Sequence, residues 1–154
     1  MSRKKVFPYA ERAQAVEEAR KNRWIDRFWA ALNLALPPDF WPQYNDLKAG
    51  DADSIDPMID FLEADPMFFR SGYIKADVLR WINRLPLTTT QMRRLQAVVV
   101  GVTERRGGRE FRRYCNLARR LEDTEFRLQI ERLRGHADAA VRRRANWVVG
   151  RMSD

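Results

Sequence analysis

The sequence predicts an all-α protein, in which helical hairpins stack as a short solenoid or pack as an irregular bundle. Apolar residues recur at spacings of three and four along most of the 154-residue chain, whereas the period-two alternation of β-strands is missing. Proline and glycine divide the chain into segments of helix length, and the total length suits a single domain. Each segment has one apolar stripe, which must be buried against a neighbouring helix.

The first predicted helix extends from Tyr9 to about Leu36. Pro8 suits the first helical position, and Pro37-Pro38 cannot continue a helix. The second half of this segment has an apolar stripe made of Ile25, Phe28, Trp29, Leu32 and Leu36. The first half, residues 11–23, is rich in alanine and polar side chains, so we expect it to be exposed or to pack only against a partner.

Residues 37–56 are predicted to form a long loop with a short turn around 41–47, because they combine Pro, Gly and Asp with three aromatic residues. Asp56-Pro57 is typical of an N-cap followed by a first helical residue, which predicts a short helix reaching Leu62. Asp65-Pro66 repeats this pattern and predicts a second helix start.

The C-terminal half predicts five helices, over residues 72–85, 89–105, 109–121, 124–134 and 139–152. Thr88 with Gln91 three residues later is a capping box, and Asp123 and Asp138 are predicted N-caps. Gly107-Gly108 and Gly135 are predicted stops. The connections have two to five residues, so neighbouring helices should be antiparallel. We therefore expect an N-terminal part, 1–65, and a helical part, 66–154, within one compact domain.

The segment from Asp138 to Gly150 resembles the HEAT-type helical repeat. The positions that match its pattern of an acidic cap, Val-Arg, a small residue, an aliphatic residue and glycine are Asp138, Val141, Arg142, Ala145, Val149 and Gly150. The pairs 72–85 with 89–105 and 109–121 with 124–134 have the same two-helix layout. This resemblance implies an α-solenoid that serves as a binding scaffold for protein or nucleic acid. In that family the Asp and the Arg commonly pair between repeats. The stretch 69–73 is similar to one in small bacterial proteins of unassigned function.

Charge is unevenly distributed along the chain, whose net charge is +8. Residues 25–69 have a balance of −7, whereas residues 101–154 have a balance of +6. Of the 29 basic residues, 24 are arginine, which suits phosphate binding and stacking on bases. The alternative is that a GC-rich genome favours Arg codons regardless of function.

Arginine residues of the last helices form the strongest candidate site. Three of them flank Gly107-Gly108 at a helix junction, and the others lie off the apolar stripes of their helices. The predicted nucleic-acid contacts are Arg105, Arg106, Arg109, Arg112, Arg113, Arg119, Arg120, Arg142, Arg143 and Arg144. The alternative is that these residues only solvate outer faces and pair with nearby glutamates, each surface pair being worth about 0–1 kcal/mol.

Two aromatic groups are candidate protein contacts. Trp147 and Arg151 lie opposite the apolar stripe of the last helix, where the indole could stack on a base or dock on a protein. Phe40 and Trp41 belong to the acidic, aromatic loop, which could also dock a partner. The alternative for both groups is packing in the interior.

Catalysis has little support in the sequence. His136 is the only histidine and Cys115 the only cysteine, which excludes a disulfide within the chain and a Cys/His zinc cluster. The carboxylates of residues 51–60 lack the spacing of a calcium-binding loop. Some solenoid proteins of this type repair alkylated DNA, but no carboxylate is singled out for that chemistry. We expect no cofactor and no metal, and we expect a cytoplasmic protein without a membrane-spanning helix or a secretory signal.

The sequence therefore predicts a non-catalytic protein that contacts nucleic acid or a ribonucleoprotein electrostatically through the Arg-rich helices. The alternative is a protein-interaction adaptor, or a small subunit of a larger assembly, in which the acidic loop or the N-terminal helix docks the partner.

Overall fold

A computed structural model of the chain describes residues 6–23 and 25–153. The helices are α1 (Tyr9–Lys21), α2 (Ile25–Leu34), α3 (Phe40–Lys48), α4 (Ile55–Ala64), α5 (Ser71–Ile82), α6 (Thr89–Arg105), α7 (Phe111–Leu121), α8 (Thr124–Leu133) and α9 (Ala139–Met152), with a 3-10 turn over Ala52–Ser54. None of the described residues lies in a strand, which confirms the all-α prediction.

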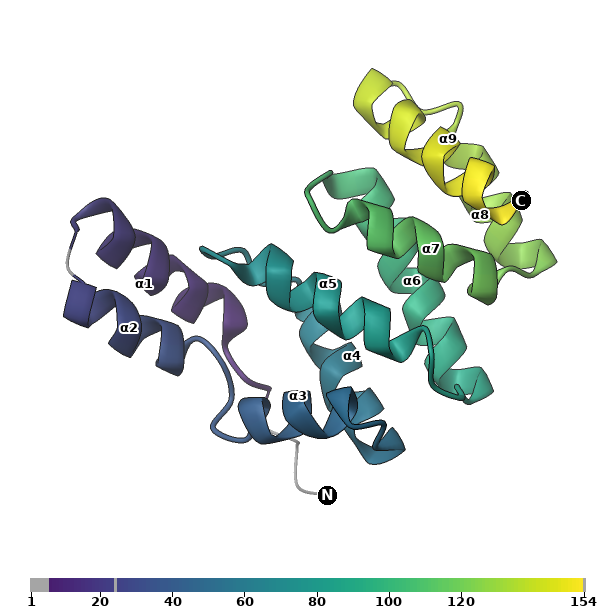
Figure 1. Cartoon of the computed structure of the whole chain (residues 1–154). Helices are drawn as coiled ribbons and strands as arrows, with labels where there is room; N and C mark the ends of the chain where they lie inside the picture. Colours follow the sequence, from purple (N-terminus) through teal and green to yellow (C-terminus); the bar gives the residue numbers. More distant parts are fainter. Residues whose placement is uncertain (1–5, 24, 154) are drawn as a thin grey trace.

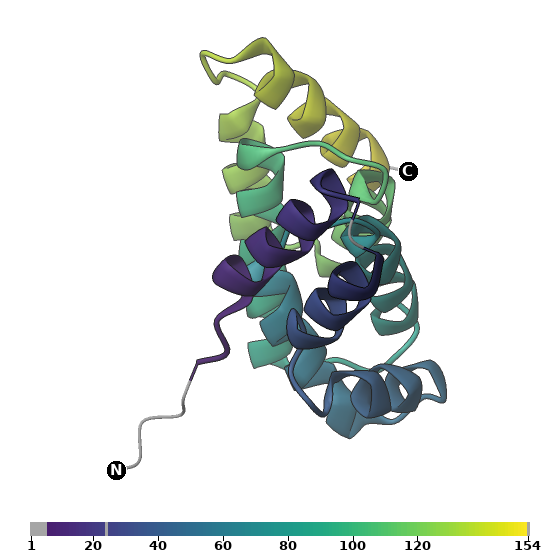
Figure 2. The same ribbon diagram turned by 90° about the vertical axis from the view of Figure 1, so that its left-hand side faces the viewer.

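Helices α4 to α9 lie in two layers. In Figure 1, α5, α7 and α9 lie side by side in front, and α4, α6 and α8 lie behind them. The view in Figure 2, turned by 90°, shows the same two layers from the N-terminal side. The hairpin of α1 and α2 lies at one end of this arrangement, and α9 lies at the other. The buried apolar residues form one continuous core that reaches from α1 to α9.

The single N-terminal helix predicted over 9–36 is wrong, because the chain turns after Lys21 and returns as α2. The side-chain amide of Asn22 donates to the Glu18 carbonyl, and Arg23 has a left-handed backbone with φ of 55°. The predicted exposure is also reversed. Tyr9, Ala13 and Val16 of α1 are buried, whereas α2 contains no buried residue.

The segment predicted as a loop over 37–56 contains α3 and the 3-10 turn. Phe40, Tyr44 and Leu47 recur at helical spacing and pack on the core. Pro42 is the third residue of α3, where its missing N–H has no partner within the helix in any case. Apolar periodicity thus outweighs the loop-forming composition of this segment.

The two Asp-Pro pairs do not cap helices as predicted. Helix α4 begins at Ile55, and the Asp56 carboxylate instead accepts a hydrogen bond from Arg94 at 3.3 Å, as part of a clamp in which Arg94 also binds Asp60 and Glu63 at 2.6 Å each. Asp65 follows the end of α4 in a left-handed conformation, with φ of 46°. Its carboxylate is therefore free to meet side chains from other helices.

The start and stop signals of the C-terminal half are confirmed. Both hydrogen bonds of the capping box between Thr88 and Gln91 are present. The side chain of Asp123 caps α8, and that of Asp138 caps α9. Helix α6 ends at Arg105, before the two glycines, and α8 ends at Leu133, before Gly135.

Candidate functional site

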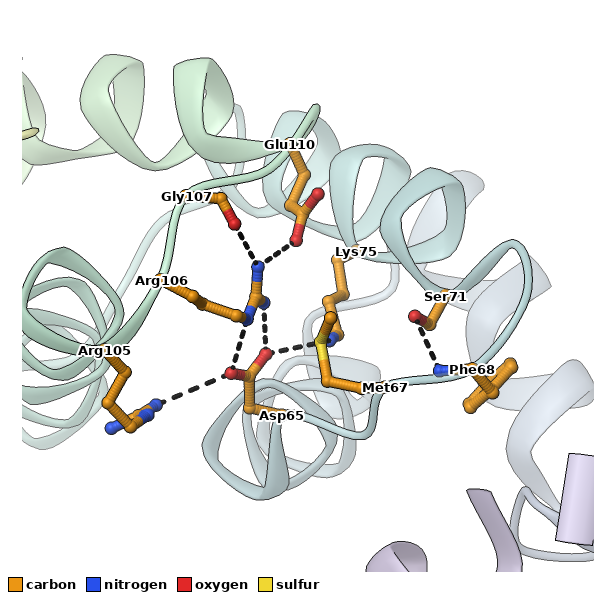
Figure 3. Close-up of polar contacts among 9 residues, drawn as sticks. All are labelled: Asp65, Met67, Phe68, Ser71, Lys75, Arg105, Arg106, Gly107 and Glu110. Carbon is orange, nitrogen blue, oxygen red and sulfur yellow. Dashed lines mark hydrogen bonds and ion pairs between the residues drawn. The ribbon is translucent and has the colours of Figure 1, made fainter. Parts of the chain in front are cut away.

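Arg105 and Arg106 do not form a free basic surface, because both point to Asp65 (Figure 3). The Arg106 guanidinium binds the Asp65 carboxylate with two nitrogens, one of them Nε at 2.9 Å from Oδ2. Its Nη1 lies 2.5 Å from Glu110 Oε1 and donates to the Gly107 carbonyl at 3.1 Å. Arg105 lies at the edge of this group, 3.6 Å from Asp65.

Lys75 completes this ionic cluster, which we define as Asp65, Lys75, Arg106 and Glu110. The Lys75 side chain has no solvent exposure, and its Nζ lies 2.8 Å from Asp65 Oδ1 and 3.5 Å from the Met67 sulfur. The cluster joins the end of α4, the middle of α5 and the loop between α6 and α7 (Figure 3). It therefore links α4, α5 and the α6–α7 connection to one another.

Two glycines make room for the Glu110 carboxylate. A Cβ on Gly72 would lie 2.8 Å from Glu110 Oε2, and a Cβ on Gly108 would lie 2.9 Å from the same atom. Gly108 also has a φ of +153°, which disfavours other residues. The glycine pair at 107–108 thus admits the carboxylate that pairs with Arg106.

The charges of the cluster neutralise one another. Burial alone would raise the pKa of the Asp65 carboxyl, but hydrogen bonds from Arg106 and Lys75 outweigh it and hold that pKa below its ordinary value. Burial lowers the pKa of Lys75, against the opposing effect of Asp65. Two anions and two cations enclosed together leave no charge to attract a ligand, so the cluster is structural.

Three further arginines of the predicted set bind backbone carbonyls. Arg144 is only 8% exposed and donates to the carbonyls of Thr103 and Glu104, at 2.7 and 3.1 Å, near the end of α6. Arg120 binds the carbonyl of Ile82, the last residue of α5, and that of Leu85 in the loop that follows. Carbonyls of the last helical turn lack partners within their helix, and cations there also complement the helix dipole.

Arg142 likewise binds two carbonyls, those of His136 at 2.7 Å and Ala137 at 2.9 Å, in the loop before α9. Asp138 caps its own helix through the amide of Ala140 at 2.8 Å. The pairing of Asp138 with an Arg of a neighbouring repeat, implied by the HEAT resemblance, does not occur among the described residues. Five arginines of the predicted set are therefore engaged within the fold, namely Arg105, Arg106, Arg120, Arg142 and Arg144.

The arginines that remain accessible gather in part around a groove between α7 and α9. This α7–α9 groove has a volume of about 620 Å³ and is lined by Gly108, Arg109, Phe111, Arg112, Cys115, Asn146, Trp147, Gly150 and Arg151. The lining residues of α7, at positions 111, 112 and 115, lie on one face of that helix. The lining residues of α9, at positions 146, 147, 150 and 151, likewise lie on one face. Of the remaining predicted arginines, Arg113, Arg119 and Arg143 are exposed but are not among the residues that line the groove.

The floor of the groove is apolar and its rim is basic. Phe111 and Cys115 are buried, whereas Trp147 is 52% exposed. The Phe111 and Trp147 rings lie 6.1 Å apart, and the Arg143 guanidinium lies 5.7 Å from the Trp147 ring centroid. Burial raises the pKa of the Cys115 thiol to about 11, so the thiol is protonated at neutral pH and is a poor nucleophile.

Arg109, Arg112 and Arg151 line the groove and Arg143 lies over the Trp147 ring, and no acidic residue lines the groove within the described chain. Arg112 and Arg151 make no hydrogen bond or ion pair with any described residue. Arg109 is held over the Tyr73 ring, 4.5 Å from its centroid, and binds the tyrosine hydroxyl. The nearest glutamate in sequence, Glu110, is turned away into the ionic cluster. The groove therefore has the chemistry of an anion site with an aromatic surface.

The predicted protein-contact residues divide between surface and core. The structure places Trp147 and Arg151 together in the α7–α9 groove. Phe40, by contrast, is 1% exposed and packs on Phe61 with ring centroids 5.0 Å apart, so it is a core residue. Trp41 is 40% exposed, and its helix α3 lies away from α7 and α9 (Figure 1).

A second, more apolar surface lies beside the N-terminal hairpin. It surrounds a depression of about 390 Å³ between α1, α2 and the segment before α5, and its lining residues are Ala19, Arg20, Arg23, Ile25, Phe28, Trp29 and Phe69. Ile25 and Trp29 are exposed, although the sequence predicted them for the interior. Phe28 and Phe69 are in edge-to-face contact at 5.8 Å.

Sequence reasoning missed Lys75 and Gly150. Lys75 lies on the apolar stripe of α5, because Val78, Leu79 and Ile82 follow it at spacings of three, four and seven. A charged residue on an apolar stripe was the signal of a buried ion pair. Gly150 lies within α9, and a Cβ placed on it would have no atom within 4 Å. A glycine inside a predicted helix was the signal for this open space beside α9.

The described residues contain no group of acidic, histidine or cysteine side chains arranged to hold a metal ion. No described helix combines the length and the hydrophobicity needed to cross a bilayer. Comparison with protein families, with curated proteins and with solved structures finds no match to this chain.

Proposed function

We propose that this protein binds nucleic acid, alone or within a ribonucleoprotein, through the α7–α9 groove and without catalysing a reaction. The observation that supports this proposal is the grouping of Arg109, Arg112, Arg143 and Arg151 around an exposed indole, with no acidic lining residue in the described chain. Guanidinium groups bind phosphate oxygens in a fork geometry, and the net charge of +8 adds a long-range attraction for polyanions.

The proposed site is smaller than the sequence suggested. Arg106 and Arg144 are enclosed in the fold, and Arg120 and Arg142 bind carbonyls. Four arginines therefore stand at the groove, of which Tyr73 holds Arg109 and Arg143 lies over the indole. Binding should depend on salt accordingly, with a slope of log affinity against log salt of about −3 for four phosphate contacts on a single strand.

We also propose that helices α4 to α9 are related to HEAT-type hairpins. Support comes from the two layers of alternating helices and from the Asp138 cap of α9. A stack of this kind presents helix faces to a ligand along its length, which suits a binding scaffold.

The proposed function is tested by fluorescence anisotropy with a labelled oligonucleotide between 50 and 200 mM salt. Arg112→Ala should reduce the magnitude of the salt slope by about 1, because one phosphate contact is lost. Arg84→Ala, which removes the same charge from an exposed position outside the groove, is the matched control and should leave the slope unchanged. Absence of binding at 50 mM salt, or equal effects of the two variants, would contradict the proposal.

A second candidate function, that of a protein-interaction adaptor, is favoured by the exposed apolar residues beside α2. Ile25, Trp29 and Phe69 form its apolar centre, and Arg23 and Arg70 are exposed at its edge. Apolar residues rimmed by positive charge fit an amphipathic helix whose polar border is acidic.

This alternative predicts that one stoichiometric protein co-purifies with the chain after nuclease treatment and is lost in an Ile25→Glu variant. The partner's bound segment, mapped by cross-linking, should be an amphipathic helix with acidic flanks. Val6→Glu, at another exposed apolar residue outside the depression, is the control and should retain the partner. If the chain purifies without a partner, or if light scattering shows that it self-associates through α2, the adaptor function is excluded.

A further inference from the structure

The α7–α9 groove differs from a plain phosphate site because its centre is aromatic. The exposed Trp147 lies beside a floor formed by the buried Phe111 and Cys115, and the arginines lie at the rim of the groove. A site for phosphate alone would require neither an exposed indole nor an apolar floor. The ligand should therefore combine an apolar, planar part with negative charge.

We propose that this groove binds unpaired nucleotides, with one base stacked on the Trp147 indole and the adjacent phosphates on Arg112 and Arg151. The inference rests on the proposed function and adds a preference for single strands. Proteins that bind single strands combine a basic groove with aromatic side chains on which successive bases stack.

Base pairing decides whether the indole can be used. In a duplex each base is stacked between its neighbours and presents only its edge to a protein, so the ring face is out of reach. A duplex would contact the arginines but gain nothing from Trp147. A base of a single strand exposes its face and can occupy the groove.

The depth of the groove depends on Gly150. This residue lies on the α9 face that lines the groove, one turn after Asn146 and Trp147, and a Cβ added to it would meet no atom within 4 Å. A glycine weakens a helix interior relative to alanine, so the sequence forgoes stability here and leaves the space beside the indole open. A planar ring could enter this space.

The groove offers little means of distinguishing one base from another. Asn146 is the one side-chain amide among its lining residues, and its Oδ1 already accepts a hydrogen bond from Arg134 Nε at 2.7 Å. Discrimination between bases requires hydrogen bonds to their edges, so we expect stacking with weak sequence preference.

The test compares a labelled 12-nucleotide single strand, as DNA and as RNA, with a duplex of the same sequence, by anisotropy at 50 mM salt. The wild-type protein should bind a single strand about 10-fold or more tighter than the duplex. Trp147→Ala should weaken single-strand binding by about 5- to 150-fold, the range found for loss of one stacked base, and leave duplex binding nearly unchanged. Trp147→Phe should retain most of the affinity.

A second variant probes the space without removing the indole. Gly150→Leu should fill the groove and weaken single-strand binding, whereas Ala139→Leu, at an exposed position in the first turn of the same helix, should not. Thermal unfolding of each variant shows whether it is folded. Gly150→Ala adds only a methyl group and should be at least as stable as the wild type.

The outcomes separate this inference from the proposed function. If Arg112→Ala weakens binding of single strand and duplex alike while Trp147→Ala and Gly150→Leu weaken neither, the inference is overturned and the proposed function stands. Equal affinity of the wild type for single strand and duplex overturns the inference too. If the wild type binds no oligonucleotide at all, the proposed function fails as well.

Discussion

Replacing Asp65 with asparagine is expected to lower the free energy of unfolding by about 3–5 kcal/mol, because it leaves buried cations without their counter-charge. Lys75 has no solvent exposure, and Asp65 is its ion-pair partner at 2.8 Å. Arg106 would keep Glu110 but lose its bidentate contact. Asparagine is the suitable replacement, since it tolerates the left-handed backbone at this position and has nearly the same shape. Urea-induced unfolding measures the change.

Asp46→Asn is the matched control, because it removes the same charge from an exposed position on α3. Its effect should lie within about 0.5 kcal/mol, the range for surface substitutions. If Asp65→Asn destabilised the protein no more than Asp46→Asn, the ionic cluster would have no part in holding α4, α5 and the α6–α7 connection together.

The difference in stability between the wild type and Asp65→Asn should depend on pH in a defined way. The pKa of Asp65 is lowered in the folded state, so its contribution to stability is complete above its unfolded value of about 3.9 and is lost as pH falls through the folded value. The difference in unfolding free energy between wild type and Asp65→Asn should therefore be constant from pH 7 to about 5 and shrink below pH 4. A difference that grew on acidification would have the wrong sign for this mechanism.

Helix boundaries in the C-terminal half could be predicted because they depend on local chemistry. Thr88, Asp123 and Asp138 satisfy amide groups two or three residues away, and no distant residue is needed to place them. The break between α1 and α2 had no proline or glycine to mark it, and α3 was hidden by Pro42. Both errors occurred where packing on the core decided the outcome.

The candidate site was harder to predict because an arginine can bind several kinds of partner. Arg106 and Arg112 are six residues apart, yet one is enclosed by Asp65 and Glu110 and the other reaches the groove. Arg144 meets carbonyls some 40 positions earlier in the chain. Helical spacing shows that these side chains avoid the apolar stripe, but it does not show which neighbouring helix end or acid lies beside them.

Phe40→Ala is expected to destabilise the protein by about 3–5 kcal/mol, whereas Trp41→Ala should cost about 1 kcal/mol or less. The two neighbours had the same predicted role, but Phe40 is 1% exposed and contacts Phe61, while Trp41 is 40% exposed. Removing a buried phenyl ring loses its transfer free energy and leaves a cavity that the surrounding helices fill only in part.

Urea-induced unfolding of the two variants measures this difference directly, and Trp41→Ala is the natural control because it removes a larger ring from the adjacent position. A loss below about 1 kcal/mol for Phe40→Ala would mean that α3 packs loosely on α4 and can move away from it. Phe40 would then be accessible to a partner, as the sequence suggested. A large loss confined to Phe40 instead leaves Trp41 as the residue of α3 that a partner could contact.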